Sequence, residues 1–460
     1  MLKIDKSSAL KIKMHIENKI ALETTIPERK NASTKANNRI TSQAYSAFAF
    51  TYNSIRSNIK ITSIIICLYF TLFICLTDNS QYQCIRLVMI EKFNIHVSDK
   101  DIADLRDRIK KTRWPDEINN NAWSHGTSLN FLKDLSEYWL DGFNWRHHED
   151  SLNKVGSYKF TSSSGLKIHY LHSKSHQEGA VPLMMSHGWP GSIQEFLKII
   201  PSLREQSKVP LDIICPSLPG FGFSDKPTEI GMNSKNIAKI QHELMAALGY
   251  KKYVVQGGDW GSTVSKWMAE LFPENCIGIH LNLVIAFPPS GDNPMEGVTA
   301  DELKMLENYE KYKSQGFGYF EIQKTKPQTI GYGLNDSPIG LAAWISEKFY
   351  GWFEGSDNKL VVSNDEVLSI ISLYWFTQSI TSSARLYKEN GDFGFSFNGI
   401  SQPMAGAIFK KDIMLPPRAW AENIYNIVQW NEYDGGHFAA LEKPEILAKD
   451  ICDFIEKLET

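Results

Sequence analysis

Short apolar segments that alternate with helix-forming segments constrain the fold of this chain more than any other feature. The predicted strands are Leu166–His172, Pro182–Ser186, Leu211–Cys215, Tyr253–Gln256 and Ile427–Trp430. Amphipathic helices are predicted near 98–111, from 235 to 248, and at the C-terminus. Short buried strands that alternate with helices predict an α/β fold whose mostly parallel central sheet is covered on both faces.

Composition narrows the class of protein further. The chain has 460 residues, of which 42% are hydrophobic and 22% are charged, so it can bury a large core and is not a mainly disordered protein. The net charge of -3 gives no general attraction to nucleic acid. None of the six cysteines form a C-x-x-C pair, which argues against a zinc site or a disulfide framework and favours a reducing compartment.

Residues 1–88 differ from the rest of the chain. They carry 12 Lys and Arg against 5 Asp and Glu, and we expect a basic, poorly ordered segment. Ile61–Leu76 is an uncharged apolar run of sixteen residues, somewhat short for a membrane span, which needs about 20. Three interpretations stay open: a short membrane anchor, a buried or peripheral segment, or sequence that the mature protein lacks. Localisation is accordingly open between the endoplasmic reticulum membrane, if 61–76 is an anchor, and the cytoplasm.

The strongest local motif is GGDWG, Gly257–Gly261, between a predicted strand and a predicted helix. A strand, G-x-nucleophile-x-G and a helix form a nucleophile elbow, the tight turn typical of α/β-hydrolases. The central residue here is Asp259. A carboxylate is poorly suited to acyl transfer, but it can displace a leaving group at saturated carbon and form an enzyme ester. The plainer interpretation is that Asp259 only caps the following helix.

A second motif, HGWPGS, follows an earlier predicted strand at His187–Ser192. In the α/β-hydrolase arrangement this loop supplies one backbone N–H of the oxyanion hole, and the residue after the nucleophile supplies the other. These donors correspond to the amides of Trp189 and Trp260. A Pro-Gly turn without a catalytic role is the alternative.

The remaining members of a catalytic triad are predicted from chain order, which in this fold is nucleophile, acid, histidine. His437, in GGHFAALEKP, follows the last predicted strand and precedes the terminal helix. Asp412, in AIFKKDIMLPP, is the best-placed acid, since Glu432 and Asp434 are very near His437 in sequence. Asp412 could also be a solvated loop residue. No nucleotide-binding loop, H-E-x-x-H motif or Cys/His cluster occurs, so neither a cofactor nor a metal is predicted.

Taken together, the motifs resemble the microsomal-type epoxide hydrolases of the α/β-hydrolase fold, which include the juvenile hormone epoxide hydrolases. The resemblance extends from about Phe93 to Leu458. The segments that carry it are RIKKTRWPDE, HGWPGS, SLPGFGFSDKP, GGDWGS, GYFEIQKTKPQTIGYGLNDSPIGLAAWISEKF, SSARLYKEN and GGHFAALEKP. It implies a helical lid inserted in the hydrolase core and a helical lead-in before it. The expected division is residues 1–88, a lead-in at 93–155, a core at 156–286 and 399–460, and a lid at 287–398.

The resemblance also implies a two-step reaction that converts an apolar epoxide and water into a vicinal diol. Asp259 attacks an epoxide carbon while two lid tyrosines, matched by Tyr319 and Tyr387, hydrogen-bond the departing oxygen. His437, oriented by Asp412, then activates water to hydrolyse the ester. Family members often carry Glu at the acid position, so Asp412 is a departure that is expected to alter the rate of ester hydrolysis.

Two other functions remain as alternatives. Haloalkane dehalogenases share the Asp elbow and a following Trp, but a departing halide needs no proton donor, and the two tyrosines argue against this chemistry. A non-catalytic binding protein of the same fold is the other alternative. The presence of all the predicted catalytic residues argues against it.

Overall fold

The computed structural model describes residues 90–459, apart from 120–122, 354–359, 392–394 and 396–397. All described residues belong to one compact unit, Leu87–Thr460. The predicted basic segment and the apolar run Ile61–Leu76 therefore lie outside the described residues. Within the described residues, no helix has both the length and the apolar character needed to cross a membrane.

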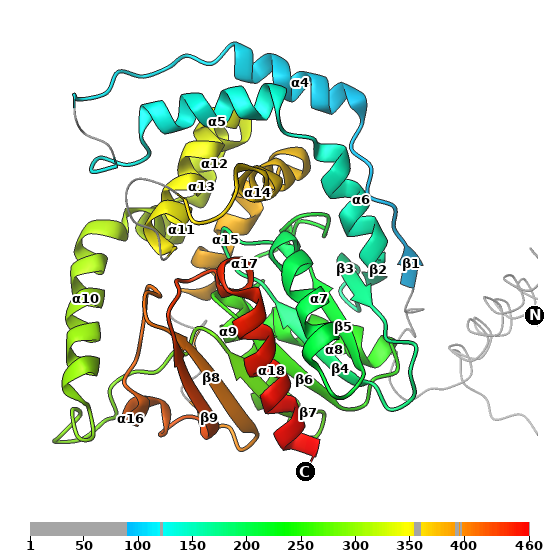
Figure 1. The fold of residues 1–460 in the computed structure, drawn as a ribbon, viewed down its shortest axis with the longest axis vertical. Coiled ribbons are helices and arrows are strands. Elements are labelled where there is room, and N and C mark those ends of the chain that lie inside the picture. Colours follow the sequence, from blue (N-terminus) through cyan, green and yellow to red (C-terminus); the bar gives the residue numbers. More distant parts are fainter. Residues whose placement is uncertain (1–89, 120–122, 354–359, 392–394, 396–397, 460) are drawn as a thin grey trace, which may run out of the picture. The chain divides into compact units, whose positions relative to one another are not determined.

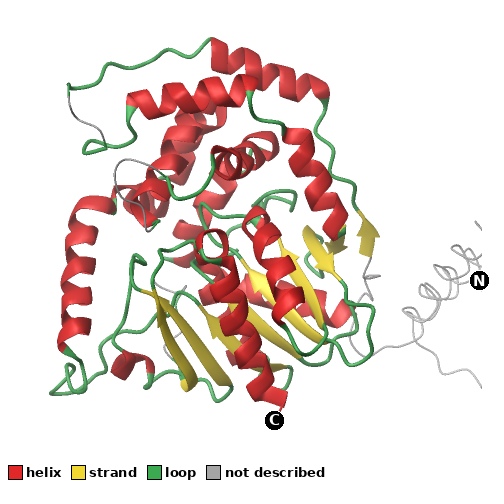
Figure 2. Ribbon diagram, in the orientation of Figure 1, coloured by secondary structure: helices red, strands yellow, loops and turns green. Residues whose placement is uncertain are grey.

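A single sheet of nine strands runs through the described part of the chain (Figure 2). Its strands are β1 Ile90–Lys92, β2 Ser157–Thr161, β3 Lys167–Ser173, β4 Val181–Ser186, β5 Leu211–Pro216, β6 Tyr253–Gly257, β7 Cys276–Leu281, β8 Pro403–Phe409 and β9 Asn426–Tyr433. The order across the sheet is β1-β2-β3-β5-β4-β6-β7-β8-β9. Pairs from β5 to β9 are parallel, and β1, β2 and β3 join antiparallel at one edge. The expected mostly parallel α/β-hydrolase sheet is confirmed.

Helices cover both faces of the sheet (Figure 1). Helices α7 (Phe196–Gln206) and α18 (Pro444–Glu459) pack together on one face, and α8 (Ser234–Ala247) and α9 (Trp260–Leu271) pack together on the other. Strand β6 shows why the central strands are apolar throughout. Its neighbours Val254 and Val255 are both buried, but they point to opposite faces and join different core clusters.

The described part of the segment between β7 and β8 forms six helices. They are α10 Ala300–Gly316, α11 Gly318–Thr325, α12 Pro327–Asp336, α13 Pro338–Trp352, α14 Asn364–Thr377 and α15 Ile380–Asn390. Helices α11 to α15 lie above the sheet, and α10 runs down beside it at the left (Figure 1). Several hydrogen bonds tie them to the core. In two of these, Tyr374 Oη donates to the Gly191 carbonyl at 2.9 Å, and the His437 amide donates to the Trp352 carbonyl at 2.8 Å. The exact lid boundaries stay predictions, because these helices belong to the same compact unit as the sheet.

Among the described residues, three helices precede the core: α4 Asp99–Lys110, α5 Leu129–Asp141 and α6 Trp145–Val155. Ser98 caps α4 by accepting a hydrogen bond from the Asp101 amide. Helix α5 contacts the lid, where buried Trp139 donates its indole N–H to Ser372 Oγ at 3.0 Å. The short elements η1 (Ile193–Glu195), α16 (Arg418–Ala421) and α17 (Ala439–Glu442) complete the described secondary structure.

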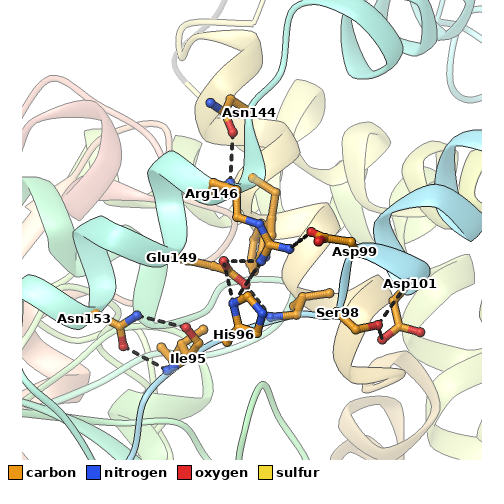
Figure 3. Close-up of polar contacts among 11 residues, drawn as sticks. Ile95, His96, Ser98, Asp99, Asp101, Asn144, Arg146, Glu149 and Asn153 are labelled. Carbon is orange, nitrogen blue, oxygen red and sulfur yellow. Dashed lines mark hydrogen bonds and ion pairs between the residues drawn. The ribbon is translucent and has the colours of Figure 1, made fainter.

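A buried glutamate joins α6 to the segment that enters α4 (Figure 3). The Val97 amide and the Trp145 indole N–H donate to Glu149 Oε1 at 2.5 and 2.8 Å. Arg146 donates to Glu149 Oε2 at 2.6 Å and to Asp99 Oδ1 at 2.5 Å. These charge-assisted hydrogen bonds hold the start of the lead-in against α6.

Candidate active site

The turn between β6 and α9 forces the side chain of Asp259 out of the sheet. Asp259 has φ 50° and ψ −129°, a conformation that L-residues rarely adopt. The flanking glycines are needed because the backbone is crowded. A Cβ on Gly261 would lie 1.9 Å from the Ser186 carbonyl oxygen, and one on Gly257 would lie 2.2 Å from the Gly261 oxygen.

The Asp259 carboxylate is held between the HGWPGS loop and the last loop of the core. Although Asp259 precedes α9, its side chain makes no capping hydrogen bond to that helix. Oδ1 instead accepts a hydrogen bond from the Trp189 amide at 2.7 Å, and Oδ2 lies 3.3 Å from His437 Nε2. A Cβ on Gly188 would lie 2.0 Å from Oδ1, so this loop position must be glycine.

His437 and Asp412 meet at the ends of adjacent parallel strands. Asp412 follows β8 and His437 follows β9, and the register of this pair sets Phe409 opposite Tyr433. His437 Nδ1 lies 2.6 Å from Asp412 Oδ1, and both side chains are buried. The Ile413 amide also donates to Asp412 Oδ1, at 2.6 Å. The structure thus brings Asp259, His437 and Asp412 into one hydrogen-bonded line.

The charge of this line raises the pKa of His437. Burial alone would lower it, but the carboxylates of Asp412 and Asp259 outweigh that effect and raise the pKa from 6.5 to about 10. With both carboxylates ionised, the imidazole therefore carries a proton at neutral pH. Loss of the Asp259 charge would leave Asp412 as the one carboxylate that raises the pKa of His437.

The two predicted lid tyrosines pack on the two predicted oxyanion-hole tryptophans. Tyr319, on α11, stacks on Trp189 with ring centroids 5.4 Å apart, and Tyr387, on α15, meets the same ring edge-on at 5.7 Å. Tyr387 also contacts the Trp260 ring at 4.9 Å, and the two tyrosine rings are 5.9 Å apart. Residues distant in sequence therefore line one aromatic site.

Both tyrosines are buried, and their surroundings keep them protonated. Burial raises the pKa of Tyr319 and of Tyr387 well above 10.0, and the negative charge of Asp259 raises both further. Two neutral phenols beside a carboxylate are hydrogen-bond donors, not nucleophiles.

Three residues of this region were missed from sequence. Trp352 contacts the rings of His437 at 5.1 Å and Tyr319 at 5.3 Å, and Lys348 places its ammonium 4.2 Å from the Tyr319 ring centroid. Glu195 is a buried acid near the nucleophile and the histidine. Only Glu195 has a local signal: S-x-x-E from Ser192 to Glu195 is a capping-box pattern, and the structure forms that box.

Among the described residues, no three or more His, Cys, Asp or Glu side chains are grouped in a way that could hold a metal ion.

The sheet, the elbow and the Asp–His–Asp line define a hydrolase of the α/β fold with a carboxylate in the nucleophile position. Profiles described as "Epoxide hydrolase N terminus" and "alpha/beta hydrolase fold" match residues 90–196 and 181–315. The chain is 38% identical to epoxide hydrolase 1 of Sus scrofa over 406 residues, covering 80% of this chain and 89% of that protein.

Two solved structures agree with this. The epoxide hydrolase of Aspergillus niger has a TM-score of 0.74 and 32% identity, covering 80% of this chain and 97% of that one. The juvenile hormone epoxide hydrolase of the silkworm Bombyx mori has a TM-score of 0.75 and 33% identity, covering 81% and 95%. The chain belongs to the epoxide hydrolase family and, within it, to the microsomal-type branch. It is an enzyme that uses water to open an epoxide.

Proposed function

We propose that Asp259, His437 and Asp412 are the nucleophile, general base and orienting acid, with Tyr319 and Tyr387 as proton donors. The observation that carries this assignment is the Asp259 carboxylate, which lies 3.3 Å from His437 Nε2 while Nδ1 of the same ring lies 2.6 Å from Asp412. A carboxylate nucleophile and an oriented imidazole are the two groups that ester formation and ester hydrolysis each require.

In the first step, an oxygen of Asp259 attacks an epoxide carbon and the carbon–oxygen bond of the ring breaks. The departing oxygen takes a proton from Tyr319 or Tyr387 and becomes the hydroxyl group of a glycol ester. The raised pKa of both buried tyrosines supports this role, because each phenol keeps its proton until a strongly basic alkoxide develops.

The second step follows from the change of charge at Asp259. Ester formation neutralises this carboxylate, so the pKa of His437 falls from about 10 and the imidazole loses its proton more readily. His437 can then accept a proton from water, whose oxygen attacks the ester carbon. The amides of Trp189 and Trp260 would hold the resulting oxyanion, a contribution of about 10² to 10³ in rate for one donor.

The aromatic surroundings favour an apolar epoxide as substrate. Trp189, Trp260, Trp352, Tyr319 and Tyr387 contact one another around the carboxylate. Binding of an apolar group between these rings is favourable because it removes apolar surface from water. The two phenols and the carboxylate are the polar groups that fix its orientation. Initial rates with xenobiotic, lipid and terpenoid epoxides would identify the preferred class.

Replacing His437 tests the proposed roles. We expect His437→Gln to form the ester normally but to hydrolyse it at least about 10²-fold more slowly, because the general base is gone. Mass spectrometry of intact protein after mixing with styrene oxide would then show a stable adduct, mapped to Asp259 by proteolysis. His147→Gln, an exposed substitution on α6, is the matched control. Absence of an adduct in His437→Gln would refute the assignment.

Membrane association through residues 61–76 is a separate proposal, supported by the sixteen uncharged residues of that run. We expect the full chain to resist alkaline carbonate extraction from membranes, and a double substitution Ile65→Lys and Tyr69→Lys to release it. Equal release of both forms would contradict membrane insertion.

A further inference from the structure

Glu195 is a buried carboxylic acid beside the active site to which the two-step reaction assigns no role. It is the last residue of η1, just after the HGWPGS loop, and only 9% of its surface is exposed. Oε1 accepts a hydrogen bond from the Ser192 amide at 3.2 Å. No group in the described part of the chain donates to Oε2.

The Glu195 side chain faces a small cavity that the nucleophile and the base also line. Gly188, Asp259, Asn282 and His437 are among the residues around it. The volume open to the centre of a water molecule is about 20 Å³, more than the roughly 10–15 Å³ that one water requires. A water in this cavity therefore has both reacting protein groups and Glu195 at its walls.

Glycine at position 191 leaves room for the Glu195 carboxyl group beside the loop. A Cβ on Gly191 would lie 2.5 Å from Glu195 Oε1. The same loop leaves room for Asp259 at Gly188, so two glycines of one loop admit two carboxyl groups to one cavity. A capping box with Ser192 accounts for the contact at Oε1, but not for a carboxyl group that shares a cavity with the nucleophile and the base.

Burial favours a neutral Glu195 side chain. Burial raises its pKa to about 8, the positive charge of His437 lowers it, and the negative charge of Asp259 raises it. A neutral carboxyl group does not repel the Asp259 carboxylate. Its oxygens can still accept a hydrogen bond from water.

We propose that Glu195 positions the water that hydrolyses the Asp259 ester. The inference rests on the proposed function. Water oxygen bonds to the ester carbon while one water proton passes to His437 Nε2. The carbon–oxygen bond to the glycol then breaks, and the glycol oxygen takes that proton from His437. The second water proton stays on the regenerated carboxyl group and, once released, restores the proton that the tyrosine donated. Glu195 accepts a hydrogen bond from the water hydrogen that His437 does not take.

Single-turnover kinetics separate this role from loop support, since the two steps have separate rate constants. We expect Glu195→Met, which keeps an unbranched side chain of similar length, to slow ester hydrolysis about 10- to 100-fold while ester formation changes less than about threefold. Glu195→Gln keeps an acceptor and should restore most of the hydrolysis rate. Ser192→Ala breaks the capping box from its other side and should leave the ratio of the two rate constants unchanged. Glu195→Ala provides a second variant without an acceptor if Glu195→Met fails to fold.

Equal slowing of ester formation and ester hydrolysis in Glu195→Met and Glu195→Ala would overturn the inference. So would a Ser192→Ala variant in which ester hydrolysis alone slows as much as it does in those two variants. His437→Gln, measured in parallel, separates the two levels of the argument. If it accumulates ester while Glu195→Met and Glu195→Ala hydrolyse ester normally, only the role of Glu195 fails. If it accumulates none, the proposed function fails and this inference fails with it.

Discussion

One side chain at the elbow decides the reaction class. With serine or cysteine at position 259 the same turn would favour acyl transfer, whereas a carboxylate can attack saturated carbon. The structure removes the capping interpretation of Asp259, because its side chain contacts Trp189 and His437 and makes no capping bond to α9. The backbone at this residue has a positive φ, and Asp259 lines the cavity that His437 also lines.

The paired tyrosines lead to a prediction about redundancy. Tyr319→Phe and Tyr387→Phe should each slow ester formation about 10- to 100-fold, because the remaining phenol still donates a proton to the alkoxide. The double variant should lose more than about 10³-fold, since no buried donor remains. Stopped-flow measurement of ester formation would check this. A double variant no slower than the single variants would show that the proton comes from elsewhere.

The raised pKa of His437 leads to a prediction about pH. Asp412 and Asp259 together raise it to about 10 in the free enzyme, and the ester removes the Asp259 charge. Ester hydrolysis should therefore increase with pH and level off at a pKa lower than that of the free enzyme. NMR titration of the free enzyme and a pH series of single-turnover hydrolysis rates give the two values. The same pKa in both states would contradict the proposed coupling.

Local sequence identifies some site residues better than others. Asp259 and His437 could be predicted because glycines and strand ends surround them, and Asp412 because the fold requires an acid after the penultimate strand. Trp352 could not, since its importance arises from the packing of α13 on the loop after β9. Nor does the pattern around Glu195 reveal the cavity that it faces.

At the scale of elements, buried Asp450 on α18 joins strands to helix. Its carboxylate accepts hydrogen bonds from His280 at 2.8 Å, Gln429 at 2.9 Å, and Asn431 and Tyr433 at 2.6 Å. Burial opposes ionisation, but His280, Asn431 and Tyr433 outweigh it and lower the pKa of Asp450 from 3.8 to about 2. This hub fastens α18 to β7 and β9, whose following loops help to form the site.

A stability prediction follows from the lowered pKa of Asp450. Its charge stabilises the fold above pH 3.8, and the stabilisation is lost as the pH falls through about 2. Asp450→Asn should reduce the free energy of unfolding by about 2 kcal/mol at pH 7 and by progressively less below pH 4.

Chemical denaturation over a pH series would measure this effect. Asp453→Asn, which removes only an exposed pair with Lys449, is the control and should cost less than about 0.5 kcal/mol. A loss in Asp450→Asn that does not change with pH would contradict an ionised Asp450.

The elements themselves were predictable where apolar runs are uninterrupted. Strands β3, β4, β5, β6 and β9 overlap the segments that the sequence predicts. Strands β1, β2, β7 and β8 had no predicted bounds: β1 is three exposed residues, and β7 contains Gly278 and His280. Such segments become strands only through pairing with neighbours that are distant in sequence.

At the scale of the whole described unit, the lead-in supports the lid and the core together. Trp139 donates to Ser372 on α14, while Glu149 anchors α6 to the segment before α4. Neither α5 nor α6 contributes a residue to the lining of the cavity beside Asp259. Their contribution is to hold the helices that carry the tyrosines over the loops of the sheet.

Removing the Glu149 carboxylate should therefore affect stability more than chemistry. Glu149→Ala leaves the Val97 amide, the Trp145 indole and Arg146 without this acceptor, and should lower the free energy of unfolding by about 3 kcal/mol. The rate of ester formation at low temperature should be almost unchanged. Asp150→Ala, an exposed neighbour on α6, is the control for thermal unfolding. Equal melting temperatures for the two variants would contradict the anchoring role.

The covalent role of Asp259 is the central claim, and isotope transfer in a single turnover tests it most directly. Excess enzyme is mixed with styrene oxide in water labelled with heavy oxygen, and the diol and the protein are analysed by mass spectrometry. The account predicts that the first diol carries no label, because its new oxygen comes from Asp259, and that one label remains in the Asp259 carboxylate. Label in the first diol, with none in Asp259, would show direct attack by water and contradict the account.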